Sequence, residues 1–70
     1  MEDKLKEIIV AILSIKKKMF DVDDIDASIK AKGIQVEGFY RNKVIERLVD
    51  SEVLLLKGTT FQRNPLYRKK

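Results

Sequence analysis

The side chains best suited to binding another molecule fall in a helical pattern over residues 37–50 and in the basic segment that follows it. Arginine and lysine hydrogen-bond well to guanine and to phosphate, and asparagine pairs well with adenine. The candidates for a contact with double-stranded DNA are Tyr40, Arg41, Asn42, Lys43, Arg47, Lys57, Arg63 and Arg68. These residue types predict a binding surface rather than a reaction centre.

No set of residues suited to catalysis accompanies them. The 70-residue chain has no cysteine and no histidine, which excludes disulfides, zinc sites built from those residues and histidine-based catalysis. Ser14, Ser28 and Ser51 lack a partner motif that would activate a nucleophile. The three glycines do not form a phosphate-binding loop. We therefore expect no enzymatic activity, no cofactor and no metal site.

An acidic run between two predicted helices is the one pattern that could suggest a metal. It consists of Asp21, Asp23, Asp24 and Asp26. This run lacks the spacing of a calcium-binding loop, and helix capping beside a solvated edge explains it better. The sequence predicts that Asp23 or Asp24 caps a helix that ends at Gly33. We expect the acidic run to face away from any nucleic acid.

Positive charge is concentrated at the end of the chain. The net charge is +4, yet residues 57–70 alone carry five basic residues and no acid. Local potential steers a protein toward a phosphate backbone more than net charge does, so this segment indicates a polyanionic partner. Basic C-terminal ends are common, and a solvated tail over residues 65–70 is the alternative.

Residues 2–18 form an amphipathic helical pattern, with acids at the start and Lys16, Lys17 and Lys18 at the end. Its apolar surface is wider than one stripe requires. We predict a homodimer contact along this helix, through Leu5, Ile9, Val10 and Leu13. Deeper burial by the C-terminal segment is an equally good explanation of the extra apolar surface.

The helix over residues 37–50 should bury Val44, Ile45 and Leu48 and expose the opposite side. Arg41 falls near the middle of the buried side. Two explanations are open for this position. Either the first turn is irregular around Gly38, or Arg41 reaches outward at the helix end.

Strand-forming segments flank and follow the helices. Residues 19–22 are long enough for a single edge strand, and residues 53–56 and 60–61 can form a hairpin. Gly58 supplies the positive φ that a short turn needs, and Asn64-Pro65 should end the pairing. Nothing divides the chain, so residues 1–70 are expected to form a single α+β domain.

The element order α-β-α-α-β-β is that of a winged helix, a three-helix bundle with a small antiparallel β-hairpin wing. Residues 44–54 resemble the junction between the third helix and the first wing strand in the winged helix-turn-helix superfamily, with Glu52 where many members have glycine. Many members are small DNA-binding transcription regulators, often dimeric. The resemblance therefore implies a non-enzymatic transcription regulator or chromatin-type factor that uses the third helix and the wing.

A narrower resemblance, to the DsrD family associated with dissimilatory sulfite reductase, covers residues 20–24, residues 48–54 and the turn at 58–60. It implies the alternative function of a protein-docking module without a DNA role. The longest apolar run, Ile8–Leu13, is six residues, too short to span a membrane. The N-terminus also lacks the cationic start of a signal peptide, so we expect a cytoplasmic protein.

Overall fold

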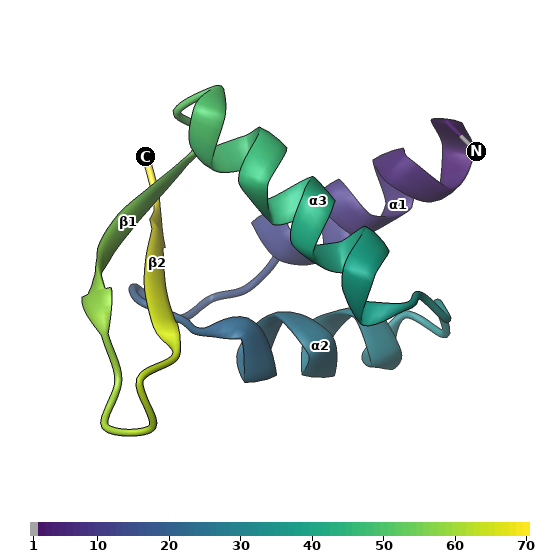
Figure 1. Cartoon of the computed structure of the whole chain (residues 1–70). Coiled ribbons are helices and arrows are strands. Elements are labelled where there is room, and N and C mark those ends of the chain that lie inside the picture. Colours follow the sequence, from purple (N-terminus) through teal and green to yellow (C-terminus); the bar gives the residue numbers. More distant parts are fainter. Residues whose placement is uncertain (1) are drawn as a thin grey trace.

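Three helices precede a two-stranded hairpin in the computed structural model, which describes residues 2–70 (Figure 1). The helices are α1 (Glu2–Leu13), α2 (Val22–Ala31) and α3 (Gly38–Asp50), and the antiparallel strands are β1 (Leu54–Thr59) and β2 (Pro65–Lys69). This α+β layout confirms the winged-helix-like arrangement predicted from the sequence. Within residues 2–70, no helix has both the length and the apolar character needed to cross a membrane.

One apolar core joins all of these parts. The buried side chains come from each helix, from the α1–α2 loop and from β1, and they are Ile8, Ala11, Ile12, Ile15, Phe20, Ile25, Ile29, Val44, Ile45, Leu48 and Leu54. The prediction for α3 is confirmed, because Val44, Ile45 and Leu48 are its buried residues. Apolar residues three and four positions apart share one helix face, which explains why these three meet the core together.

The first helix is shorter than predicted. α1 ends at Leu13, so Lys16, Lys17 and Lys18 lie in the following loop rather than in a last helical turn. The Lys69 ammonium donates to the carbonyls of Leu13 at 3.0 Å and Ile15 at 2.6 Å. A cation from β2 thus satisfies carbonyl groups that a helix end leaves without partners.

The second helix begins with a capping box at a different residue from those predicted. Asp21, rather than Asp23 or Asp24, is the N-cap, and its carboxylate accepts a hydrogen bond from the Asp24 backbone at 3.1 Å. The Asp24 carboxylate accepts in return from the Asp21 backbone at 3.1 Å. Capping therefore does explain part of the acidic run.

The predicted edge strand over residues 19–22 is reduced to one bridge. Phe20 and Tyr67 exchange backbone hydrogen bonds of 2.9 and 2.7 Å. Because Tyr67 also pairs with Leu56, β2 lies between β1 and the Phe20 segment. This bridge fixes the α1–α2 loop alongside the hairpin.

The hairpin differs from the predicted one in both its turn and its second strand. Residues 65–69 form β2, so the segment expected to be a basic tail is structured, and the turn lies over residues 60–64. Pro65 is tolerated because it is the first residue of its strand, where no N–H is needed. Gly58 does have a positive φ of 123°, but it lies in a register shift of β1, a bulge, rather than in the turn.

Candidate nucleic-acid interface

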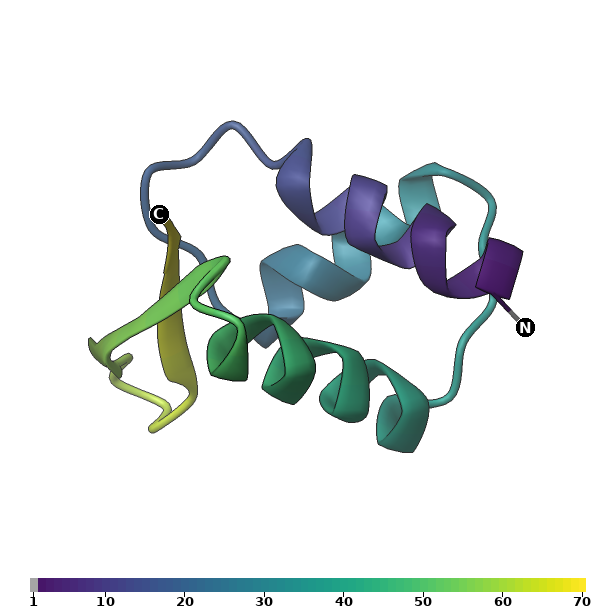
Figure 2. The ribbon, with the colours of Figure 1, turned by 90° about the horizontal axis from the view of Figure 1, so that it is seen from above.

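The third helix and the hairpin loop face the same side of the molecule. Seen from above, α3 and the loop over residues 60–64 lie on one side, and α1 lies on the other (Figure 2). In the view of Figure 1 the loop lies below α3, at the foot of the hairpin, so a partner must be extended to contact both. We refer to α3 together with this loop as the front face.

The exposed side of α3 carries three of the predicted DNA-binding residues, Asn42, Lys43 and Arg47. The Lys43 ammonium lies 5.0 Å from the centre of the exposed Phe39 ring, a cation–π contact. Tyr40 is only partly exposed, since it packs against the core. The front face therefore offers one lysine, one amide and one arginine from α3, with Tyr40 largely engaged within the fold.

Arg41 bridges two helices. Its guanidinium Nη1 donates to Asp26 of α2 at 2.6 Å, and its side chain is only 18% exposed. Nε and Nη2 of Arg41 also donate to the Asn42 amide oxygen, at 3.1 and 3.0 Å. Arg41 thus reaches from the helix end toward a carboxylate on α2. Because its amide oxygen is occupied, Asn42 offers only N–H donors to a partner, which suits phosphate or guanine better than adenine.

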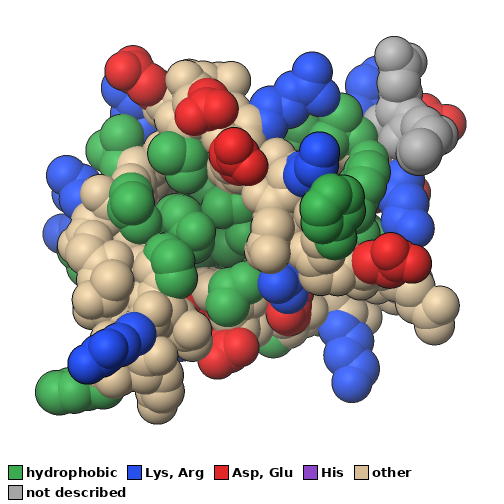
Figure 3. Space-filling model, viewed as in Figure 1, with side chains coloured by type: hydrophobic (Ala, Val, Ile, Leu, Met, Phe, Trp, Pro, Cys, Tyr) green, Lys and Arg blue, Asp and Glu red, His purple; other side chains and the backbone are tan. Residues whose placement is uncertain are grey.

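The charge of α3 is mixed. Glu46 and Asp50 are exposed on the same helix as Lys43 and Arg47. Figure 3 shows acidic side chains over the end of α3 that leads to β1, and an apolar area between α3 and the hairpin. Leu56 pairs with Tyr67 on the sheet face that meets the core, and it is 58% exposed. The C-terminal half of α3 is therefore less suited to phosphate than its N-terminal half.

The hairpin loop exposes two residues of different chemistry at its end. Arg63 has a φ of 63°, the left-handed position that follows a tight turn and usually favours glycine, and its N–H donates to the Thr60 carbonyl at 2.9 Å. Phe61 is fully exposed. Phe61 lies in the turn rather than in the strand predicted over residues 60–61, and its exposure follows from that position.

Lys57 and Arg68 are exposed on the two strands rather than on the loop. Arg68 is paired with Leu55 in the hairpin register. The predicted DNA-binding residues therefore divide into a front-face group and a sheet group, and within the front-face group Arg41 is engaged by Asp26 and Asn42.

The predicted dimer residues also divide into two groups. Leu5 and Ile9 are partly buried and pack against the core, whereas Val10 is 56% and Leu13 39% exposed. An open groove of about 770 Å³ lies between α1 and the loop after α2, with Val10 and Ile34 among its lining residues. The apolar surface available for a second copy is thus smaller than predicted.

Charge interactions outside the front face support the fold. The Lys17 ammonium donates to Asp24 at 2.9 Å, and this hydrogen bond lowers the pKa of Asp24 below its ordinary value and raises the pKa of Lys17. Burial raises the pKa of the Tyr67 phenol, although the charge of Arg41 opposes this shift. In residues 2–70, no cluster of three or more acidic side chains has the geometry to hold a metal ion.

Comparisons of the chain with protein-family models, with curated proteins and with solved structures found no match.

Proposed function

We propose that the protein is a non-enzymatic, double-stranded DNA-binding protein that uses its front face, as a small transcription regulator or chromatin-type factor. The observation that supports this most directly is that α3 and the loop over residues 60–64 share one side of the molecule. In this proposal, Lys43 of α3 and Arg63 of the loop contact the same duplex. No acidic residue follows Glu52, so the hairpin adds only positive charge to this side.

The N-terminal half of α3 is the part that enters the major groove in this proposal. A B-DNA major groove admits an α-helix, and helix-turn-helix proteins place residues from the start of the second helix of the motif against the bases. Lys43 and the amide protons of Asn42 would lie there, while Arg63 contacts the backbone beside the adjacent minor groove. Glu46 and Asp50 disfavour close phosphate contact farther along the helix. The expected binding therefore depends more on backbone contacts than on sequence reading.

A fluorescence-anisotropy titration with random duplex DNA at low and moderate salt tests this proposal. We expect affinity that falls steeply with salt, and about a tenfold loss when Lys43→Ala and Arg63→Ala are combined. The matched control combines Lys30→Ala and Lys32→Ala, which removes the same charge at the far end of α2 and should have little effect. Absence of binding at micromolar protein and low salt would overturn the proposal.

One observation favours a protein-docking module as the second candidate function. The apolar area between α3 and the hairpin, with Leu56 more than half exposed, is bordered by the acidic end of α3. Such a surface suits a protein segment better than a phosphate backbone. The resemblance to the DsrD family would make dissimilatory sulfite reductase the partner. Co-sedimentation with that enzyme, lost in Leu56→Lys, would support this candidate.

A further inference from the structure

A second group of basic residues lies outside the front face, beside the hairpin. Lys16 and Lys18 belong to the α1–α2 loop, Lys57 to β1 and Arg68 to β2, and all four are exposed. Among residues 2–70, none of these four side chains forms an ion pair or a hydrogen bond. We call these four residues the lateral basic surface.

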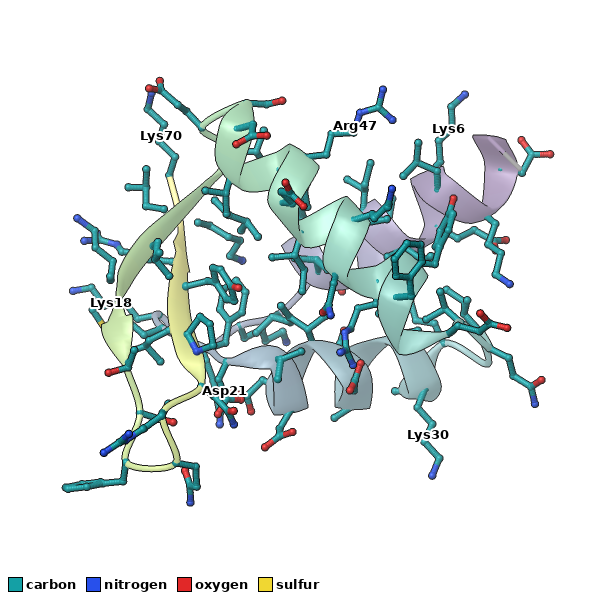
Figure 4. The ribbon with its side chains drawn as sticks, viewed as in Figure 1. Lys6, Lys18, Asp21, Lys30, Arg47 and Lys70 are labelled. Carbon is teal, nitrogen blue, oxygen red and sulfur yellow. The ribbon has the colours of Figure 1, made fainter. Side chains whose placement is uncertain are left out.

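Two contacts bring the loop and the strands together. The Ile15 carbonyl accepts from the Lys69 ammonium of β2 at 2.6 Å, and the Phe20 backbone forms its bridge with Tyr67 of the same strand. Residues 16–19 are therefore held along the edge of β2. Figure 4 shows Lys18 and Lys70 at the hairpin end of the molecule and Lys6 at the opposite end.

Strand alternation determines which way the cation on β2 points. Tyr67 packs against the core and Lys69 reaches the end of α1, so both side chains face inward. Successive side chains of a strand point to opposite faces, and Arg68 therefore points outward. Its partner in the register, Leu55, lies on the same outward face. The sheet thus presents Arg68 away from the core, on the strand whose edge is bordered by the loop segment of residues 16–19.

Two of the acidic residues that flank these segments are paired with other cations, and the carboxylate of a third, Asp21, accepts the Asp24 backbone N–H of the α2 capping box. Asp24 pairs with Lys17 at 2.9 Å, and Glu52 lies 3.4 Å from Lys70. Residues 8–20 and 53–70 contain no acid. Asp21 and Asp23 form no ion pair within residues 2–70, but the four cations of the lateral basic surface outnumber them, which leaves a net positive potential there.

We propose that the lateral basic surface binds the phosphate backbone of duplex DNA, in addition to the contact made by the front face. This inference rests on the proposed function. Three of the four residues are lysines, which act as flexible point charges and suit phosphate without selecting a base sequence. The surface thus supplies affinity and salt dependence, while the front face supplies orientation on the duplex.

Two variants with equal net charge test this inference. The lateral variant combines Lys16→Gln, Lys18→Gln, Lys57→Gln and Arg68→Gln. The control variant combines Lys4→Gln, Lys6→Gln, Lys30→Gln and Lys32→Gln. Each variant loses four positive charges, which lowers the net charge from +4 to zero. Thermal unfolding by circular dichroism verifies that both remain folded, and anisotropy with random duplex DNA over a salt series measures binding.

Each phosphate contact contributes about 0.9 to the slope of log affinity against log salt, so loss of four contacts should reduce the slope by about 3.6. We expect that reduction in the lateral variant and a change below about 1 in the control. Equal changes in the two variants, or no change in the lateral variant while the parent binds, would overturn the inference. If the lateral variant binds like the parent but the combination of Lys43→Ala and Arg63→Ala lowers the affinity for duplex DNA, the proposed function is retained without the lateral contact. A parent protein that does not bind duplex DNA at all would overturn both.

Discussion

Arg41 occupies a position where helical spacing calls for an apolar residue, and Asp26 on α2 makes this possible. The guanidinium is mostly buried and its hydrogen bond to Asp26 measures 2.6 Å. Asp26→Asn should lower the free energy of unfolding by about 1 kcal/mol, because it removes the charge that pairs with a largely desolvated cation. Urea denaturation measures this change. Glu46→Gln, an exposed carboxylate on α3, is the control, and an equal loss there would show that the ion pair contributes nothing specific.

Asp24 gives the fold a defined dependence on acid. The hydrogen bond from Lys17 holds the pKa of Asp24 below its ordinary value near 3.8, although partial burial opposes the shift. As the pH falls, Asp24 is therefore protonated in the unfolded chain before it is protonated in the folded one. The contribution of the ion pair to the free energy of unfolding is complete above about pH 4 and is lost as the pH falls through the lowered pKa of Asp24. Lys17→Gln should reduce the difference between the unfolding free energies at pH 5 and pH 2. That difference would be unchanged if the ion pair did not contribute.

Among the elements, both bounds of α3 could be predicted from local sequence, whereas α1 was predicted with the correct start but not the correct end. The apolar period of residues 37–50 predicted both the bounds of α3 and its buried face. Glu52 stands where the resemblance to winged helices leads one to expect glycine. Its φ of 61° lies in the left-handed region that favours glycine, which agrees with that expectation. Where α1 ends, the carbonyl of its last residue, Leu13, and that of Ile15 just beyond it accept from Lys69, a residue 56 and 54 positions away. No local pattern carries that information.

In the candidate site, only the residues whose placement depends on local sequence were predictable. Helical periodicity alone places Asn42 and Lys43 on the exposed side of α3. The partner of Arg41 was not predictable, because Asp26 is 15 residues away on another helix. The loop residues Phe61 and Arg63 were misplaced because the position of the turn depends on the register of β2, which is a tertiary property.

Lys69 connects the hairpin to the end of α1, and its removal should affect both elements. Lys69→Met leaves two carbonyl groups without a cationic donor, and we expect the free energy of unfolding to fall by about 2 kcal/mol. Amide exchange should show faster opening in the last turn of α1. Lys70→Met is the matched control, because its exposed ammonium reaches only Glu52 at 3.4 Å. Equal losses in the two variants would contradict the role assigned to Lys69.

For the molecule as a whole, the proposed homodimer now depends on the exposed part of α1. Val10 and Leu13 remain available, whereas Leu5 and Ile9 serve the core of one copy. If α1 forms the contact, sedimentation should give a mass of twice 8.1 kDa, and Val10→Lys should reduce it to 8.1 kDa because a lysine cannot be buried cheaply between apolar surfaces. Val10→Leu should preserve the dimer. A dimer that survives Val10→Lys would place the contact elsewhere.

Helices and hairpin should unfold together, because Phe20 belongs to the helical core and is also paired with the hairpin. Phe20 is fully buried among the helices, and its backbone pairs with Tyr67 of β2. Phe20→Ala should cost about 3–5 kcal/mol, which is comparable to the whole stability expected for a domain of this size. We expect far-ultraviolet circular dichroism and hairpin amide protection to be lost in one transition. Phe61→Ala, which removes the same side chain from a fully exposed position, should change stability by less than about 0.5 kcal/mol. If the helical signal persisted while hairpin protection was lost, the hairpin would be an independent unit, and a surface shared by α3 and the loop could not be rigid enough to hold a duplex in one orientation.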